Sequence, residues 1–95
     1  MRHRALSFKA AIALVAISDN TEGSDVRYVS AATGLDYTEA RTAIYSLTQK
    51  GLVERLKLGK GHRGRPVNIL FSTEQGDRLA IQIELDLDTL LSRRA

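Results

Sequence analysis

The fold of this chain is decided by residues 36–66, which read DYTEARTAIYSLTQKGLVERLKLGKGHRGRP. Asp36 and Glu39 stand three residues apart, which is the spacing of a capping box at the start of a helix. Gly51 follows where such a helix would stop, because glycine readily takes the left-handed conformation just past a helix end. The stretch therefore predicts a helix over residues 37–50, then a strand, then a basic segment rich in glycine.

The predicted helix has two unlike faces. Ala40, Ala43, Ile44 and Leu47 recur at the spacing of one buried helical face. The opposite face is polar but carries few full charges, whereas a merely solvated helix would usually carry more Glu and Lys. Donor-rich side chains of medium length are what reading the edges of DNA bases requires. This face is therefore a candidate for the major groove of DNA.

Arg41 is the candidate for a guanine contact, because its planar guanidinium can bond two acceptors on one base edge. The other candidate DNA contacts on this helix are Thr38, Thr42, Tyr45, Gln49 and Lys50. Two alternatives stay open at this stage. Arg41 could instead pair with Glu39 or Glu54, and the ring of Tyr45 could pack beneath the hairpin that follows.

Residues 59–66 predict the tip of a β-hairpin that lies outside the core, since glycine stands at positions 59, 61 and 64. The candidate DNA contacts in it are Lys60, His62, Arg63 and Arg65. Arginine suits a narrow minor groove, where the negative potential is concentrated. We therefore expect this tip to contact the DNA backbone or the adjacent minor groove, with a solvated loop as the alternative. The flanking strands are marked by Leu52, Val53, Leu56 and Leu58, and by Val67, Ile69 and Phe71 in alternation.

Two further helices precede this stretch. The first is predicted from Ser7 to about Ser18, with a buried face at the positions of helical spacing. That face comprises Phe8, Ala11, Ile12, Val15 and Ala16, and it is widened by Leu14 and Ile17. The second is short, starts at Ser24 or Asp25 and ends at Thr33-Gly34. Its inward face is predicted to consist of Val26, Val29 and Ala32, with Leu35 filling the next corner.

The C-terminal segment is ambiguous. Ile81, Ile83, Leu85 and Leu87 alternate with polar residues as in a strand, yet apolar residues also recur at helical spacing. We predict a helix beginning at Ser72 or Thr73, because the segment is long and lacks turn residues after Gly76. It carries more apolar surface than one small domain needs, which predicts dimerisation. The candidate dimerisation residues are Leu6, Phe8, Leu79, Ile83, Leu87, Leu90 and Leu91.

Composition bounds the function. The 95 residues predict one domain (1–95), which includes the dimerisation helix (73–94). Residues 1–72 carry eleven Lys and Arg against six Asp and Glu, whereas residues 73–95 carry three against five. A basic body suits nucleic acid. The chain has no cysteine and only two histidines, so neither a thiolate zinc site nor a metal site at His62 is expected. No apolar run has the length of about 20 residues that a membrane helix needs, and we expect no membrane partner.

Two segments carry a family resemblance. TGLDYTEARTAIYSLTQKGLV (33–53) resembles the recognition-helix segment of MarR-like, ArsR-like and PadR-like proteins. GHRGRPVNILFSTEQG (61–76) is similar to the wing of the same superfamily, in which Gly-Arg-Pro precedes a strand and then Thr-x-x-Gly. The matching residues are Gly64, Arg65, Pro66, Thr73 and Gly76. The resemblance implies a mainly α fold with a small β-hairpin (α+β), namely a winged helix–turn–helix with an added C-terminal helix.

The resemblance implies a cytoplasmic, nucleoid-associated regulator of prokaryotic, plasmid or viral origin. We expect sequence-specific binding to double-stranded DNA by a homodimeric repressor, with residues 37–50 in the major groove and residues 59–66 as the wing. The alternatives are an architectural or plasmid-partition protein that coats DNA, and a winged-helix module for protein–protein assembly. We expect no enzyme and no cofactor, since Gly59-Lys60-Gly61 lacks the rest of a nucleotide-binding loop. Nothing in the sequence requires a small-molecule effector.

Overall fold

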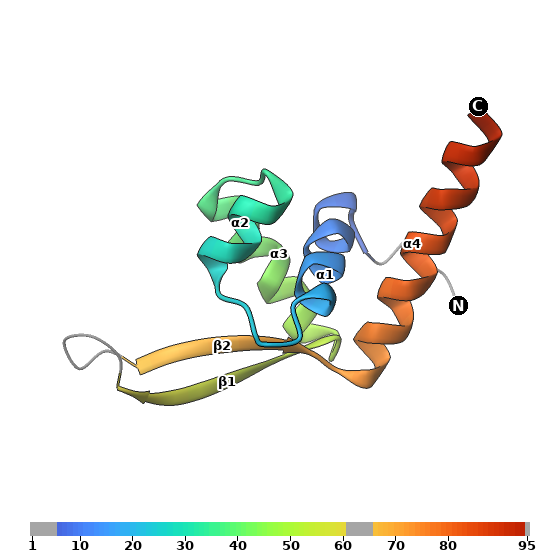
Figure 1. Cartoon of the computed structure of the whole chain (residues 1–95). Coiled ribbons are helices and arrows are strands. Elements are labelled where there is room, and N and C mark those ends of the chain that lie inside the picture. Colours follow the sequence, from blue (N-terminus) through green and yellow to red (C-terminus); the bar gives the residue numbers. More distant parts are fainter. Residues whose placement is uncertain (1–5, 61–65, 95) are drawn as a thin grey trace.

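The computed structural model describes residues 6–60 and 66–94, and it confirms the predicted order of three helices, a hairpin and a last helix (Figure 1). The elements are α1 (Phe8–Asp19), α2 (Val26–Thr33), α3 (Tyr37–Gln49), β1 (Val53–Lys60), β2 (Pro66–Ser72) and α4 (Glu74–Arg94). The fold is therefore α+β and mainly helical. Residues 79–91 lie within α4, so the helical interpretation of the ambiguous segment is confirmed.

Local sequence signals account for the helix ends. Asp36 and Glu39 form the predicted capping box, in which each side chain accepts a hydrogen bond from the other residue's backbone N–H. Asp25, rather than Ser24, caps α2, because its carboxylate accepts from the backbone N–H of Tyr28 at 2.7 Å. Gly34 follows α2 with φ 81°, the left-handed conformation predicted for that position.

The core lies where the three N-terminal helices, the hairpin and the first turns of α4 meet. Its fully buried larger side chains are Leu14, Ile17, Val29, Ile44 and Leu47. On α3 the predicted apolar face is confirmed, since Ala40, Ala43, Ile44 and Leu47 are all buried. This packing fixes which side of α3 remains exposed.

The predicted buried face of α1 is confirmed at Leu14 and Ile17 and is wrong at Phe8. Ala10, Ala13, Leu14 and Ile17 are the buried residues, whereas Phe8 is 72% exposed and the other four predicted positions are only half-buried. The helix is apolar nearly all round, so its periodicity could not choose between faces, and packing against both α3 and α4 decides. Ala32 of α2 is likewise exposed instead of inward.

The hairpin pairs β1 with β2 in antiparallel register, with Val53 opposite Ser72 and Arg55 opposite Leu70. Of the residues of β2 whose burial is described (68–72), Leu70 is buried, whereas the alternating residues Ile69 and Phe71 are half-buried on the other face. Leu56, expected as a strand apolar residue, is 49% exposed. The sequence also gave no sign that Ser24 pairs with Leu70 through two backbone hydrogen bonds of 2.7 and 3.0 Å. The hairpin is thereby tied to the segment that leads into α2.

The start of α4 is fixed against the turn between α3 and β1. The hydroxyl of Thr73 donates to the carbonyl of Gly51 at 2.8 Å and accepts from the backbone N–H of Gly76 at 3.0 Å. A Cβ at Gly76 would overlap the carbonyl oxygen of Leu52, so only glycine permits this close approach. The Thr-x-x-Gly motif thus has a packing reason. From there α4 rises past α1 and extends beyond the other helices (Figure 1).

Candidate nucleic-acid interface

The outward face of α3 carries every helical residue predicted to contact DNA. Thr38, Arg41, Thr42, Tyr45, Gln49 and the capping residue Lys50 are all exposed. Tyr45 is 62% exposed, so the alternative in which its ring packs beneath the hairpin is wrong. Because the other side of α3 is buried, this polar face is held at a fixed angle to the body.

Arg41 lies at the centre of this face. Together with Thr38, Thr42 and Tyr45 it lines a shallow hollow of about 390 Å³. Its guanidinium carbon stands 5.9 Å from the centre of the Tyr37 ring, near the limit of a cation–π contact. Arg41 forms no ion pair with Glu39 or Glu54, since the two ion pairs among the described residues are Lys9–Glu39 and Arg78–Glu74. The guanidinium is therefore available to an external acceptor.

Arg55 is a candidate contact that the sequence reasoning missed. It is exposed on β1 and lines the hollow beside Arg41, as well as a second hollow of about 370 Å³ that both arginines share. The strand period could have found it. Arg55 stands two residues after the buried Val53, so its side chain leaves the same face of the strand. α3 and β1 thus place two guanidinium groups beside one another.

An ion pair fixes the start of α3 to α1. The Lys9 ammonium donates to the Glu39 carboxylate at 2.6 Å, while the other oxygen of that carboxylate accepts from the Asp36 backbone N–H at 3.1 Å. The hydrogen bond to Lys9 lowers the pKa of Glu39, and the same bond raises the pKa of Lys9. Glu39 therefore serves α3 as a structural residue and is the partner of Lys9 instead of Arg41.

The strands β1 and β2 run out from the body on the side of α2 (Figure 1). Lys60 ends β1, whereas His62, Arg63 and Arg65 lie outside the described residues. Their contacts with DNA stay predictions. Among the residues that the structure describes there is no cluster of three His, Cys, Asp or Glu side chains that could hold a metal ion.

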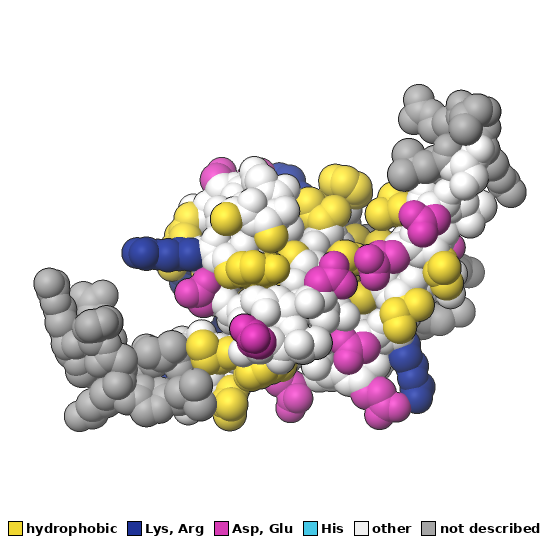
Figure 2. Space-filling view, in the orientation of Figure 1, with side chains coloured by type: hydrophobic (Ala, Val, Ile, Leu, Met, Phe, Trp, Pro, Cys, Tyr) yellow, Lys and Arg dark blue, Asp and Glu magenta, His cyan; other side chains and the backbone are white. Residues whose placement is uncertain are grey.

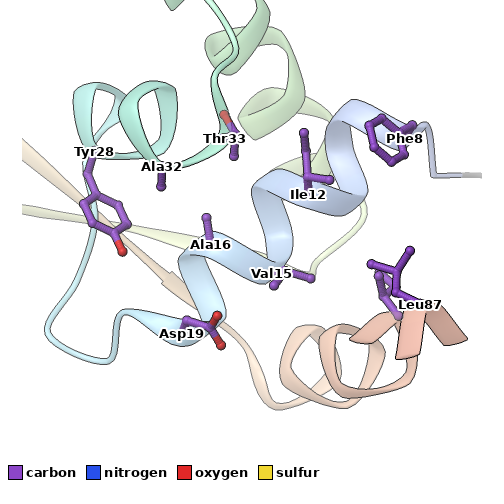
Figure 3. Close-up of a pocket in the computed structure, with 10 residues that line it drawn as sticks. Phe8, Ile12, Val15, Ala16, Asp19, Tyr28, Ala32, Thr33 and Leu87 are labelled. Atoms are coloured by element: carbon purple, nitrogen blue, oxygen red, sulfur yellow. The ribbon is translucent and has the colours of Figure 1, made fainter. Parts of the chain in front are cut away.

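The residues predicted for dimerisation divide into two groups. Leu6, Leu79 and Ile83 are half-buried and pack against the chain's own core. Phe8 and Leu87 are exposed and line an apolar groove of about 500 Å³ between α1, α2 and α4. Figure 3 shows Leu87 across this groove from Phe8 and Val15. Leu90 and Leu91 belong to α4, but their side chains lie outside the described part.

Comparison with solved structures assigns the fold. A MarR-family transcriptional regulator from Rhodococcus sp. RHA1 superposes with a TM-score of 0.75 and 27% identity, over 94% of this chain and 60% of that one. The chain is a winged helix–turn–helix protein. FabT of Streptococcus pneumoniae, solved in complex with DNA, superposes on this winged helix with a TM-score of 0.76 at 18% identity, over 98% of this chain and 62% of FabT.

The chain covers only part of those two proteins. It spans about 60% of the two proteins above, whereas it matches 93% of SSV1 F-93, with a TM-score of 0.64 and 24% identity over 92% of its own residues. No protein-family model and no curated protein sequence matches the chain. Within residues 6–60 and 66–94, no helix is long and apolar enough to cross a membrane.

Proposed function

We propose that this winged helix binds double-stranded DNA and regulates transcription, with α3 in the major groove and the hairpin against the backbone or the adjacent minor groove. One observation carries the proposal: the exposed face of α3 is polar around an unpaired Arg41, and Arg55 stands beside it. A helix fits the major groove, where an arginine can bond two acceptors of guanine. The complex of FabT with DNA supports the same use of a shared fold.

The residues divide by role. Arg41 reads a base, while Thr38, Thr42 and Tyr45 contact phosphates or thymine methyl groups from the same face. Arg55 contacts a phosphate near the root of the hairpin, because α3 occupies the major groove and β1 lies beside α3. The predicted wing residues extend the contact along the duplex.

We further propose that the regulator acts as a homodimer and as a repressor. The distal half of α4 extends beyond the other helices (Figure 1), and Phe8 of α1 and Leu87 of α4 leave apolar surface exposed along the groove between these helices. Pairing two copies through this groove covers that surface and presents two copies of α3 to two half-sites, which increases specificity geometrically. Occupying such a site blocks access of polymerase to a promoter. Sedimentation tests the dimer, and a monomer at micromolar concentration would contradict it.

The experiment is a titration of duplexes with the wild type and Arg41→Ala, using DNA recovered from a random pool by the wild type. Loss of a base-reading arginine should cost about 1–3 kcal/mol, roughly 5- to 150-fold in affinity. The matched control is Arg78→Ala, which removes an exposed arginine from the first turns of α4, and all variants are measured on a duplex that holds one site only. Equal affinities for the wild type and Arg41→Ala would contradict the proposal.

A charge reversal separates this function from protein–protein assembly. If the fold serves protein–protein assembly alone, the wild type should not bind duplex DNA, and Arg41→Glu and Arg55→Glu should leave binding of the protein partner unchanged. If it serves DNA, each reversal should abolish duplex binding while the unfolding midpoint stays unchanged, because both side chains are exposed.

A further inference from the structure

The distal part of α4 is apolar on two opposite sides. At 100° per residue, Ile81 and Leu85 share one side, and Ile83 and Leu87 lie about 160° away from them. Ile83 packs against the core and Leu87 lines the groove, so the second pair faces the body. Ile81 and Leu85 are 57% and 54% exposed on the outer side. The strand-like alternation in the sequence thus becomes two apolar stripes on one helix.

Single apolar side chains are common on protein surfaces, so exposure alone is not informative. The spacing and the flanking charges distinguish this pair. Arg78, Ile81, Leu85 and Asp88 follow one another at i, i+3, i+7 and i+10, which places them on one face of α4. We call these four residues the outer stripe. It is positive at one end, apolar in the middle and negative at the other.

The outer stripe is complementary to itself when reversed. Consider two α4 helices paired antiparallel, with the two-fold axis at the level of Ile83 along the helix. Arg78 of one copy then lies opposite Asp88 of the other, and Ile81 lies opposite Leu85. Each contact occurs twice, as a two-fold interface requires. Arg78 is already paired with Glu74 at 2.7 Å, but both side chains are more than three-quarters exposed, and such surface pairs exchange at little cost.

Charge also opposes DNA as the occupant of this surface. Glu84, Asp86 and Asp88 stand along the same half of α4, and Figure 2 shows hydrophobic side chains between acidic ones there. A phosphate backbone would be repelled. A second copy offers an apolar stripe and a cation at the matching end instead.

Size decides how strong the contact is. The outer stripe covers about 15 Å of helix, with two apolar side chains per copy. The area that two such side chains per copy can bury is far less than the roughly 1,200 Å² that stable interfaces bury. The contact is therefore too weak to hold two free molecules together. It becomes effective when DNA holds two copies side by side, because tethering raises their effective concentration to the order of millimolar.

We infer that the outer stripe of α4 joins neighbouring copies of this protein on DNA, antiparallel and centred on Ile83, so that binding to long duplexes is cooperative. The inference rests on the proposed DNA binding, and it uses the side of α4 opposite to that of the proposed dimer. Two different two-fold contacts on each copy generate an open chain along the duplex. This arrangement favours the DNA-coating alternative over occupation of one isolated operator.

Cysteine cross-linking tests the contact directly, because the chain contains no cysteine. Ile81→Cys and Leu85→Cys, carrying tags of different mass, are mixed and oxidised on a duplex of about 60 base pairs, several times the site of one copy. The mixed 81–85 disulfide should form at least about fivefold faster than the 81–81 disulfide, which is displaced by one helical turn. Asp86→Cys, exposed on another face of α4, is the control and should cross-link slowly.

Charge exchange tests the register. Arg78→Asp and Asp88→Arg should each remove cooperativity on the long duplex, although they change the net charge in opposite directions, and the double variant should restore it. Equal rates for the 81–85, 81–81 and 86–86 disulfides, or no restoration by the double variant, would overturn the inference. A duplex of about 20 base pairs, long enough for one site only, reports DNA binding separately. If the protein does not bind that short duplex, the proposed function is wrong. The contact between two α4 helices is then tested by the same cross-linking in concentrated protein without DNA.

Discussion

α3 and α4 differ in how many apolar faces they carry. α3 has one, formed by Ala40, Ala43, Ile44 and Leu47, and all of it is buried in the chain's own core. α4 has two, and the core covers only part of one of them. A helix with one apolar face has its orientation fixed by its own fold, so its other face can be committed to a ligand. A helix with two needs a second molecule to cover the remainder.

The largest difference between the two helices is expected when one apolar side chain is removed from each of them. Leu47→Ala on α3 should lower the free energy of unfolding by about 2–5 kcal/mol, since it leaves a cavity at a fully buried site. Ile81→Ala on α4 should change it by less than about 0.5 kcal/mol, because the side chain is exposed. Urea unfolding of dilute protein measures both. Equal losses would show that Ile81 is buried in the monomer and would remove the second apolar face.

The root of α4 should behave unlike its distal half. Gly76→Ala places a methyl group against the carbonyl of Leu52, which is backbone and cannot rotate away. We expect a loss of about 1–3 kcal/mol, the usual cost of overpacking. Gln75→Ala, at the exposed neighbouring position, is the matched control and should be nearly neutral. A stable Gly76→Ala protein would mean that α4 starts farther from β1 than the structure places it.

The smallest expected effect concerns the ion pair at the start of α3. The pKa of Glu39 is lowered in the folded state, so its contribution is present above the unfolded pKa, near 4.3, and is lost as pH falls through the folded pKa. The pKa of Lys9 is raised, so its contribution is present below the unfolded pKa and is lost as pH rises through the folded one. The pair therefore stabilises across neutral pH.

Glu39→Gln should lower the urea midpoint at pH 7, and the gap to the wild type should close as the solution is acidified below about pH 4. Glu54→Gln, an exposed carboxylate on β1 outside both ion pairs, controls for the change in net charge. A gap that persists unchanged at low pH would show that Glu39 acts through something other than its charge.

The sequence predicted what is locally encoded. The capping box at Asp36 and the left-handed Gly34 depend on neighbours along the chain, and both are present. The single face of α3 was also predictable, because its polar and apolar residues separate cleanly. The exposed residues that α3 contributes to the hollow could therefore be predicted from the sequence.

What the sequence could not predict depends on contacts between distant segments. The face of α1 is chosen by packing against α3 and α4, so Phe8 was wrongly expected to be buried. The pairing of Ser24 with Leu70 joins segments 46 residues apart and has no local signal. The strand period puts Arg55 on the face of Val53, but only the packing of β1 against α3 places it beside Arg41. The alternation in α4 was ambiguous because two opposite faces of one helix look like one face of a strand.

The most direct test of the central claim is the salt dependence of binding to the selected duplex. If each copy of a dimer neutralises about four phosphates, the slope of log affinity against log salt should be roughly −7, at about 0.9 per contact. Arg55→Ala should reduce its magnitude by about 2, one contact per copy, whereas Arg78→Ala should leave it unchanged on a duplex that holds one site only. An affinity that does not change with salt, or a slope that Arg55→Ala leaves intact, would contradict an interface built from α3 and β1.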